Sequence, residues 1–261
     1  MTIDPSQPSA DEAERYRRQT ILPEIGADGQ ARLHRSAMLI VGAGGLGSPV
    51  AMYLAASGVG RLGIVDDDVV DLGNLQRQII HGTGDLGMTK TASAAKRIRD
   101  INPNCEVIAH NLRLTRANAQ AIVAGYDIVL GCVDNFEARR GINAACVALN
   151  KPNIFGTVAR FEGQASVFTL DDGPCYQCFF RAPPDDAATP AIDKGVLGPV
   201  PGVIGSIQAN EAMKIAIGMG QTLSGRLLLY DALRLRFREL AIKRDPACPV
   251  CGSAARKQES L

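Results

Sequence analysis

The chain has 261 residues, of which 46% are hydrophobic and 21% are charged, and its formal net charge is +1. This composition is typical of a globular protein in water and excludes a disordered or collagen-like chain. The near-neutral charge gives no support for nucleic-acid binding, which usually requires a basic surface. The N-terminal sequence has neither a basic start nor an apolar core, so no signal peptide is predicted. Seven cysteines without such a signal favour reduced thiols in the cytoplasm.

The first half of the chain alternates short apolar runs with longer amphipathic runs. Residues 1–10 are predicted to form a mobile tail, and Asp11–Arg18 a short charged helix. The uncharged stretch Ala37–Gly60 is broken by glycines, which favours a strand, loop and helix over a membrane span. Further along, strands are predicted at Ala37–Gly42, Arg61–Asp66, Glu106–Ala109, Asp127–Cys132 and Asn153–Thr157, and helices at Leu46–Ser57, Thr89–Ile101, Thr115–Ala124 and Asn135–Asn150. This alternation predicts an α/β fold with a Rossmann-like, mostly parallel sheet flanked by helices.

The second half is predicted to continue the sheet with antiparallel strands. Gly163–Leu170 alternates like a strand, and Arg226–Tyr230 and Arg234–Lys243 are expected to form an antiparallel, half-exposed pair. Arg181–Pro201 is rich in Pro, Asp and Gly and is predicted to be a long loop, which usually carries a function. Val203–Ile217 is predicted to be helical.

A glycine loop follows the first predicted strand. Gly42, Gly44 and Gly47 form a G-x-G-x-x-G pattern that opens a helix, and Gly45 adds a fourth glycine. Glycines let the backbone approach phosphates, and the helix N-terminus offers unpaired N–H groups to them. The pattern alone is weak evidence, because a tight turn without a ligand also contains glycines. Its setting between a strand and a helix favours nucleotide binding.

An acidic residue, Asp66, ends the second predicted strand, 19 residues after Gly47. A carboxylate at this place accepts hydrogen bonds from ribose hydroxyls, which suits NAD and ATP equally. The residues that follow Asp66 distinguish between NAD and ATP as the ligand. Arg77 and Lys90 offer positive charge for phosphates, and Asp134, after a buried strand, is a candidate Mg²⁺ ligand. This set favours a nucleoside triphosphate.

Two C-x-x-C pairs, Cys175/Cys178 and Cys248/Cys251, are separated by 69 residues. Two such pairs are typical of a tetrahedral, structural Zn²⁺ site, which would tie the C-terminal region to the middle of the chain. Two disulfides and a redox C-x-x-C are the alternatives. The remaining cysteines, Cys105, Cys132 and Cys146, lie in apolar patterns typical of a core, and the three scattered histidines indicate no metal site.

Together these motifs closely resemble the bacterial ubiquitin-activating-enzyme-like adenylyltransferases, the MoeB/ThiF/HesA family. The resemblance extends from about residue 12 to residue 252 and includes molybdopterin-synthase and thiamine-pathway adenylyltransferases. It rests on segments that occur in one order: Arg15-Tyr16-x-Arg18-Gln19, the glycine loop, Asp66-x-Asp68, Asn74-Leu75-Gln76-Arg77-Gln78, Lys90, Ile101-Asn102-Pro103, Asp134-Asn135 and the two cysteine pairs.

The resemblance implies a cytoplasmic homodimer that uses ATP, Mg²⁺ and Zn²⁺. It implies that the Gly-Gly carboxylate of a small ubiquitin-like sulfur-carrier protein is joined to AMP, before sulfur arrives from a donor such as a cysteine desulfurase or rhodanese. It also implies a single domain over residues 11–261, with a nucleotide-binding half (11–150) and a carrier-binding half (151–261). No membrane or nucleic-acid partner is implied.

The resemblance assigns roles to the motif residues. Asp66 would bind the ribose, Gly45 would approach the nucleotide, and Arg18 would enter the other subunit's site, much like an arginine finger. The long loop near Arg181–Pro201 would cross over the C-terminal tail of the carrier. The phosphate path and its metal would be lined by Asp68, Asn74, Leu75, Gln76, Arg77, Gln78, Lys90, Asp134 and Asn135.

One feature departs from the thiamine branch. Its members often carry a cysteine a few residues before a G-V-x-x-P segment, here Gly195–Pro199, but no cysteine lies between Cys178 and Cys248. We therefore expect adenylation without a covalent enzyme–carrier intermediate in this loop, and the pathway stays open between molybdopterin and thiamine. The rival functions are a nicotinamide or flavin oxidoreductase with the same loop, and a non-catalytic scaffold of the same fold.

Overall fold

A computed structural model describes residues 10–181 and 195–252 of the chain. Residues 1–9 of the predicted tail and most of the predicted loop at Arg181–Pro201 lie outside the described residues, and Ala10, the last residue of that tail, begins a helix. The helices are α1 (Ala10–Thr20), α2 (Gly26–Arg35), α3 (Gly47–Ala56), η1 (Leu72–Asn74), η2 (Thr83–Asp85), α4 (Lys90–Ile101), α5 (Ala119–Ala124), α6 (Phe136–Ala148), α7 (Tyr176–Phe179) and α9 (Pro199–Ile217). The strands are β1 (Ala37–Val41), β2 (Arg61–Val65), β3 (Glu106–His110), β4 (Ile128–Gly131), β5 (Asn153–Ala159), β6 (Glu162–Phe168), β7 (Arg226–Asp231) and β8 (Arg236–Ala241).

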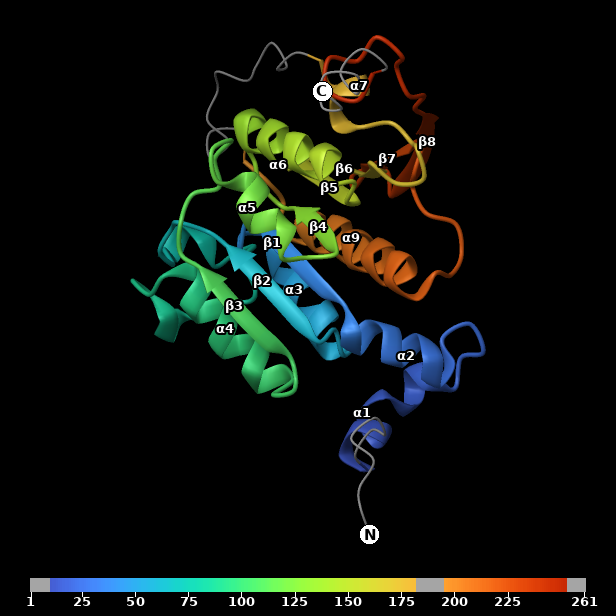
Figure 1. The fold of residues 1–261 in the computed structure, drawn as a ribbon. Helices are drawn as coiled ribbons and strands as arrows, with labels where there is room; N and C mark the ends of the chain where they lie inside the picture. The colour runs from blue at the N-terminus through green and yellow to red at the C-terminus, as the bar shows by residue number, and fades with distance from the viewer. Residues whose placement is uncertain (1–9, 182–194, 253–261) are drawn as a thin grey trace.

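The described strands form one sheet in the order β3-β2-β1-β4-β5-β6-β7-β8 (Figure 1). The strands from β3 to β5 are parallel to one another, whereas β6, β7 and β8 pair antiparallel. This confirms the predicted α/β fold. The strand order reverses between β1 and β4, and ligands of open α/β sheets bind beyond the carboxyl ends of the strands at such a point.

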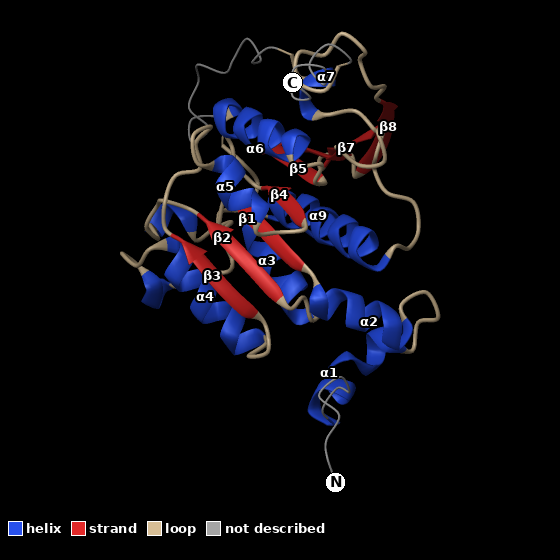
Figure 2. Cartoon of the chain, in the orientation of Figure 1, coloured by secondary structure: helices blue, strands red, loops and turns tan. Residues whose placement is uncertain are grey.

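Both faces of the parallel part of the sheet are covered by helices (Figure 2). Alternate residues of a strand point to opposite faces. In β1, Met38 and Ile40 pack in the cluster that contains residues of α3, α4 and α9, while Leu39 and Val41 pack with α5 and α6. This double burial is the reason that the first strands have continuous apolar sequences. Among the described helices, none is both long and apolar enough to cross a bilayer.

The structure corrects two helix predictions. Helix α2 was not predicted, because its sequence contains two glycines and buries only Gly29 and Leu33. Helix α5 begins at Ala119 rather than Thr115, since the Asn118 Oδ1 atom accepts a hydrogen bond from the Thr115 N–H at 2.7 Å. That local bond favours a turn over a helix.

Two predictions in the second half also change. Every residue of β8 is exposed, so the expected half-exposed pattern is wrong: β8 is the last strand of the sheet and, among the described residues, only β7 pairs with it. Helix α9 begins at Pro199, inside the predicted loop. Proline suits the first turn of a helix because it has no N–H to leave unpaired there.

Candidate functional site

The glycine loop connects β1 to α3 and lies against the end of β4. Gly42 has a φ of +100°, and a Cβ atom on it would come within 2.7 Å of the Cys132 carbonyl oxygen. A Cβ atom on Gly47 would lie 1.9 Å from the Gly42 carbonyl oxygen. Both positions therefore require glycine, which explains why the sequence motif and this tight turn occur together.

Asp66 follows β2 and its carboxylate holds the glycine loop. Its Oδ2 atom accepts a hydrogen bond from the Ala43 N–H at 2.8 Å, and its Oδ1 atom accepts one from the Asp68 N–H at 2.9 Å. Each carboxylate oxygen has two acceptor positions, so both retain capacity for a ribose hydroxyl. The carboxylate of Asp66 therefore fits the predicted role of binding the ribose of a nucleotide.

The segment after η1 brings two polar side chains to the glycine loop. The Nε2 atom of Gln78 lies 3.6 Å from the place where a Cβ atom on Gly44 would be, and the Arg77 Cγ atom lies 3.5 Å from that place on Gly45. The buried Gln78 Oε1 atom has no hydrogen-bond partner among the described residues. A buried polar atom without a partner beside a glycine loop fits a site that binds a polar ligand.

The other members of this segment have backbone roles here. The Asn74 carbonyl oxygen accepts hydrogen bonds from the N–H groups of Arg77 and Gln78. Leu75 ends η1, and the Gln76 carbonyl oxygen packs against Gly198 at the start of α9. These three residues thus shape the turn that carries Arg77 and Gln78.

Lys90 is the first residue of α4 and its side chain is only 7% exposed. A cation is unfavourable at a helix N-terminus unless an anion is close. In this structure the anion is Asp68, whose Oδ2 atom lies 2.9 Å from the Lys90 Nζ atom. Thr89 caps the helix by accepting a hydrogen bond from the Ala92 N–H.

Asp134 is exposed on the loop between β4 and α6. This loop contacts the glycine loop, because a Cβ atom on Gly42 would lie 3.4 Å from the Val133 nitrogen. Neighbouring Asn135 caps α6: its Oδ1 atom accepts a hydrogen bond from the Ala138 N–H at 2.8 Å. The fold thus brings Asp134 and the glycine loop to adjacent strand ends, as the sequence predicted.

Arg139 supports this loop and was not singled out from the sequence. Its Nε and Nη2 atoms donate to the Val133 carbonyl oxygen at 3.3 and 3.0 Å, and Nη2 also donates to the Thr157 Oγ1 atom at 2.7 Å. Burial lowers the pKa of Arg139, while its hydrogen bond to Tyr176 acts in the opposite direction. A charged residue in an amphipathic helix carries no sequence signal for such a role.

Arg18 does not join the other candidates within this chain. It lies on α1, next to the amino end of the sheet (Figure 1). There the Tyr16 hydroxyl accepts a hydrogen bond from the Asn102 Nδ2 atom at 2.8 Å, at the C-terminal end of α4. The glycine loop lies at the carboxyl ends of the strands, so any contact of Arg18 with a nucleotide requires a second subunit.

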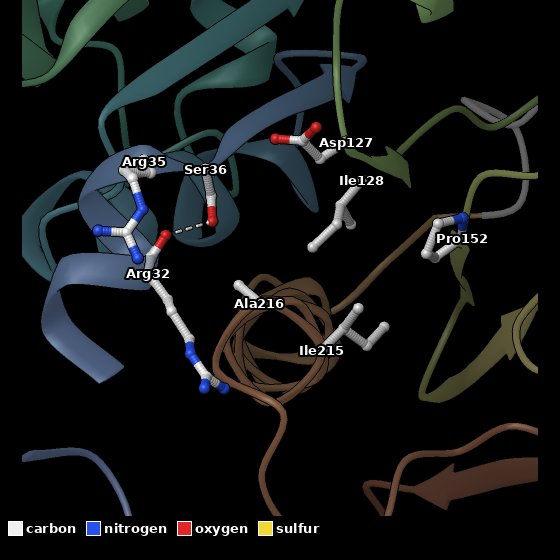
Figure 3. A pocket seen from close by; sticks show the side chains of 8 residues that line it. All are labelled: Arg32, Arg35, Ser36, Asp127, Ile128, Pro152, Ile215 and Ala216. Carbon is white, nitrogen blue, oxygen red and sulfur yellow. Dashed lines mark hydrogen bonds between the residues drawn. The ribbon is translucent and has the colours of Figure 1, made fainter. Parts of the chain in front are cut away.

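A shallow pocket of about 360 Å³ also opens at the amino end of the sheet (Figure 3). Its lining includes none of the candidate residues and consists of Arg32, Arg35, Ser36, Asp127, Ile128, Pro152, Ile215 and Ala216. It lies where β1 and β4 begin, whereas the glycine loop follows the end of β1. The pocket is therefore separate from the candidate nucleotide site.

The four cysteines of the two C-x-x-C pairs meet in one cluster, and their sulfur atoms all lie within 4.8 Å of one another. The Sγ atoms of Cys175 and Cys248 are 3.6 Å apart, and those of Cys178 and Cys251 are 3.4 Å apart. A regular tetrahedron with Zn–S bonds of about 2.3 Å has sulfur separations of about 3.8 Å. These separations are far longer than a disulfide bond, so the disulfide alternative is wrong and the cluster can hold zinc.

Backbone and amide donors surround this cluster. The Asn143 Nδ2 atom of α6 donates to the Cys175 Sγ atom at 3.7 Å, and the Asp245 N–H donates to the Cys178 Sγ atom at 3.4 Å. Donors of this kind stabilise thiolate ligands of a metal. The Asn143 Oδ1 atom also accepts a hydrogen bond from the Tyr176 N–H at 2.8 Å, so α6 and the first cysteine pair are tied together.

The other three cysteines are buried core residues, as predicted. Burial raises the pKa of the Cys105 thiol and of the Cys146 thiol to about 12, and it raises the pKa of Cys132 further. A thiol with a raised pKa contains little thiolate at neutral pH and is a poor nucleophile. Cys132 contacts the glycine loop through its carbonyl oxygen, but burial raises the pKa of its thiol as it does for the other two.

Asp85 offers a pH-dependent test of the segment beside the site. Its hydrogen bond from Lys96, together with those from Gly82 and Ser93, lowers the pKa of Asp85 to about 2. The ionised form thus stabilises the folded state above the unfolded pKa of about 3.9, and this contribution is lost as the pH falls toward 2. We expect Asp85→Asn to lower the free energy of unfolding at pH 7 by about 1–3 kcal/mol.

Urea denaturation at several pH values measures this effect. The difference between Asp85→Asn and the unmodified protein should decrease steeply between about pH 4 and pH 2, since the carboxyl of the unfolded chain is protonated there and the ionised folded form loses its advantage. The exposed Glu24 supplies the control, and Glu24→Gln should change stability little at any pH. A difference of equal size at pH 2 would contradict the ionic contribution.

Comparison with known proteins identifies relatives along nearly the whole chain. The sequence model of the ThiF family matches residues 16–250. The Sulfur carrier protein adenylyltransferase of Thermus thermophilus is 47% identical over 255 residues, covering 95% of this chain and 94% of that protein. The Adenylyltransferase and sulfurtransferase MOCS3 of Mus musculus is 49% identical over 246 residues, covering 94% of this chain and 54% of the mouse protein. This chain therefore spans about half the length of the mouse relative.

Solved structures share the fold at low sequence identity. E. coli MccB crystallised with ATP superimposes with a TM-score of 0.81 at 23% identity, covering 91% of this chain and 74% of MccB. E. coli MccB with MccA-N7isoASN gives a TM-score of 0.82 at 22% identity, covering 95% of this chain and 76% of MccB. These structures bear out the architecture alone. The family match over most of the chain shows more: the protein is a member of the ThiF family.

Proposed function

We propose that this protein activates a small ubiquitin-like sulfur-carrier protein by joining its C-terminal Gly-Gly carboxylate to AMP. The observation that carries the proposal is the meeting of the glycine loop, Asp66, Gln78 and Lys90 around the carboxyl ends of β1 and β2, beside the loop of Asp134. A relative named as a sulfur carrier protein adenylyltransferase and another named as an adenylyltransferase and sulfurtransferase support the same reaction. The oxidoreductase alternative would leave Lys90 and Arg77 without a role.

In the proposed reaction a carboxylate oxygen of the carrier attacks the α-phosphorus of ATP. The bond between that phosphorus and the bridging oxygen of the β-phosphate breaks, and pyrophosphate leaves with the bonding electron pair. No proton is transferred, so the protein requires no general base. Its task is to bring two anions together and to offset the charge that accumulates on the phosphates.

The roles of the individual residues follow from their chemistry and place. Asp66 accepts hydrogen bonds from the ribose, while Arg77 and Lys90 compensate phosphate charge. Asp134 and Asp68 offer carboxylate oxygens, the ligands that Mg²⁺ prefers. When bound, Mg²⁺ neutralises phosphate charge in the transition state. Lys90 is released from Asp68 when a more highly charged phosphate replaces that carboxylate as its partner.

The function is tested by ATP–pyrophosphate exchange with purified carrier proteins of the same organism. Labelled pyrophosphate should enter ATP only when a carrier ending in Gly-Gly is present, because the reversible step needs that carboxylate. The same carrier without its last glycine is the matched control and should support no exchange. Equal exchange with the shortened carrier, or exchange with no carrier at all, would contradict the proposal. Comparing the carriers also separates molybdopterin from thiamine synthesis.

We further propose that the protein is a cytoplasmic homodimer and that Arg18 completes the site of the other subunit. Arg18→Ala and Lys90→Ala should each be inactive alone. When subunits of the two variants exchange, one of the two sites of each mixed dimer contains both residues. A mixed dimer should therefore have up to half of the activity of an unmodified dimer. A mixture of Arg77→Ala and Lys90→Ala is the control, since every site then lacks one residue. Equal activity in both mixtures would show that Arg18 does not act across the interface.

The absence of a cysteine between Cys178 and Cys248 gives a further expected outcome. The carrier should leave as an adenylate that is never bonded to this protein, because the buried thiols of Cys105, Cys132 and Cys146 have raised pKa values. A non-reducing gel of enzyme, carrier, ATP and a sulfur donor measures this. An enzyme–carrier adduct that disappears when one of these cysteines is replaced would contradict this prediction. It would indicate instead a covalent mechanism of the thiamine type.

A further inference from the structure

His81 is a buried histidine that lies behind the glycine loop. Its side chain is reached by two hydrogen bonds: the Nε2 atom lies 2.9 Å from the Ala43 carbonyl oxygen, and the Nδ1 atom lies 2.8 Å from the Ser93 Oγ atom. Only 6% of the residue is exposed. His81 therefore connects α4, which carries Ser93, with the backbone of the glycine loop.

The hydrogen bonds assign the proton on the imidazole. A carbonyl oxygen only accepts, so the Nε2 atom must carry the hydrogen that it shares with Ala43. Burial lowers the pKa of His81, and Lys90 adds to this effect, whereas the bond to Ala43 and the charges of Asp66 and Asp85 oppose it. The Ser93 hydroxyl has a single hydrogen, which it donates to Asp85, so with that bond kept Nδ1 donates to the Ser93 Oγ atom and the ring is charged. In the neutral ring Nδ1 accepts the Ser93 hydrogen, and the hydroxyl then gives up its bond to Asp85. The bond from Nε2 to Ala43 is the same in both forms.

Ser93 in turn anchors this histidine to a charged pair. Its Oγ atom lies 2.9 Å from the Asp85 Oδ2 atom, and the Asp85 Oδ1 atom pairs with the Lys96 Nζ atom at 2.9 Å. Asp85 also accepts a hydrogen bond from the Gly82 N–H at 3.0 Å. The imidazole is thus held on the side away from the loop by groups that belong to η2 and α4.

The bond to Ala43 sets the direction of one peptide unit in the loop. The Ala43 carbonyl and the Gly44 N–H belong to the same unit, and in a trans peptide these groups point in opposite directions. The described residues contain no cis peptide. With its carbonyl directed at His81, this unit directs the Gly44 N–H away from the core, and among the described residues no partner is present for that N–H.

The neighbouring peptide units are held in the same manner. The Ala43 N–H donates to the Asp66 Oδ2 atom at 2.8 Å, which fixes the orientation of the preceding peptide unit, Gly42–Ala43. The Gly44 carbonyl accepts hydrogen bonds from the Ser48 N–H at 2.9 Å and from the Ser48 Oγ atom at 2.7 Å. These bonds fix the orientation of the following peptide unit, Gly44–Gly45. A segment with three glycines in four residues has little conformational preference of its own, so its geometry depends on these outside contacts.

We propose that His81 is a positioning residue that orients the Gly44 N–H toward the phosphates of the bound nucleotide. This inference rests on the proposed ATP site. Oriented N–H groups at the start of a helix bind phosphates without a side-chain charge. His81 itself does not contact the nucleotide; it acts through the Ala43–Gly44 peptide unit. The sequence contains no sign of this role, since His81 lies 38 residues after Ala43.

Three substitutions and one control separate this role from a merely structural one. His81→Leu removes both hydrogen bonds, whereas His81→Gln supplies a donor for Ala43 and an acceptor for Ser93. Ser93→Ala leaves the imidazole in place but removes its anchor. His110→Leu is the control, because it removes a partly buried histidine whose side chain binds the Tyr126 hydroxyl at 2.8 Å and not the glycine loop, while its carbonyl bond to the Asp66 N–H belongs to the backbone and is kept.

The measurements are the Kd for ATP and the number of binding sites, both from calorimetry with the full chain, and the KM and kcat of pyrophosphate exchange. We expect His81→Leu to weaken ATP binding by about 10- to 100-fold with the number of sites unchanged, and to raise the KM for ATP more than it lowers kcat. His81→Gln should restore the Kd to within about threefold of the unmodified protein, and Ser93→Ala should weaken binding by about three- to tenfold.

Each outcome decides the inference. A loss of folded molecules would lower the number of binding sites without changing the Kd, and this result would overturn the positioning role. Failure of His81→Gln to bind better than His81→Leu would overturn it too. If His81→Leu does not fold, an unchanged Kd in Ser93→Ala overturns it. Absence of ATP binding by the unmodified protein would overturn the proposed function as well, whereas equal Kd values in all variants overturn this inference alone.

Discussion

Replacing Lys90 by alanine is expected to lower carrier-dependent pyrophosphate exchange by about 10²–10³-fold, the usual cost of removing one group that stabilises a transition state. The side chain is 7% exposed and stands at the first residue of α4. Its charge is therefore screened little by water, and the helix N-terminus adds to the positive potential that a phosphate meets. The exchange assay with saturating carrier measures the effect directly.

The control for this result is Arg97→Ala. Arg97 is an exposed cation on the same helix, so its removal changes the net charge equally without touching the proposed phosphate path. We expect exchange to stay within about twofold of the unmodified protein, because exposed charges are screened by water and salt. The thermal midpoint of Lys90→Ala should show that the fold is retained. A Lys90→Ala protein that is folded and fully active would place the phosphates elsewhere.

The second large effect concerns the cysteine cluster, which we propose binds one structural zinc ion per chain. Cys248→Ser should reduce the zinc content from about one per chain to near zero, because structural sites need all four ligands. The ion would close a loop between Cys178 and Cys248. A cross-link that closes a long loop contributes about 2–5 kcal/mol, which corresponds to roughly 5–15 °C in the thermal midpoint of a chain of this size.

Elemental analysis and thermal denaturation measure these two quantities on the same preparation. Cys105→Ala is the matched control, since Cys105 is buried but lies outside the cluster. It should keep the zinc and lose only packing energy. The effect of Cys248→Ser on the rate per folded molecule should be smaller than its effect on stability. Unmodified protein without zinc, prepared under reducing conditions, would contradict the proposed site.

Short-range spacing made much of the candidate site predictable. A glycine at a φ of +100° and another packed against a carbonyl oxygen leave a pattern in the sequence, because no other residue fits there. Each C-x-x-C pair places two sulfur atoms on one turn, so each half of the cluster is visible locally. Asp66 and Asp134 were predictable as strand-end residues once the buried strands were recognised, since parallel strands end at the same edge of the sheet.

Other contacts had no local signal. Gln78 and Arg77 reach the glycine loop only because the turn after η1 folds over it. The two cysteine pairs meet only when segments with 69 residues between them come together. The exposure of β8 depends on its being the last strand, which the order of the sheet decides. Alternation along a strand cannot report whether a second layer covers either face.

The sequence by itself determined the α/β fold, the glycine loop and the four cysteines, because these depend on residue types at fixed local spacings. Only the tertiary structure decided which buried side chains support that loop. His81 binds the main-chain carbonyl of Ala43 in the glycine loop, 38 residues away, and Arg139 binds that of Val133 in the neighbouring loop of Asp134. Every residue type presents the same carbonyl group. A contact with a main-chain carbonyl does not restrict the residue type of the partner, so the sequence contains no pattern that predicts it. Such a contact is identified only once the packing of the helices α4 and α6 against the sheet is known.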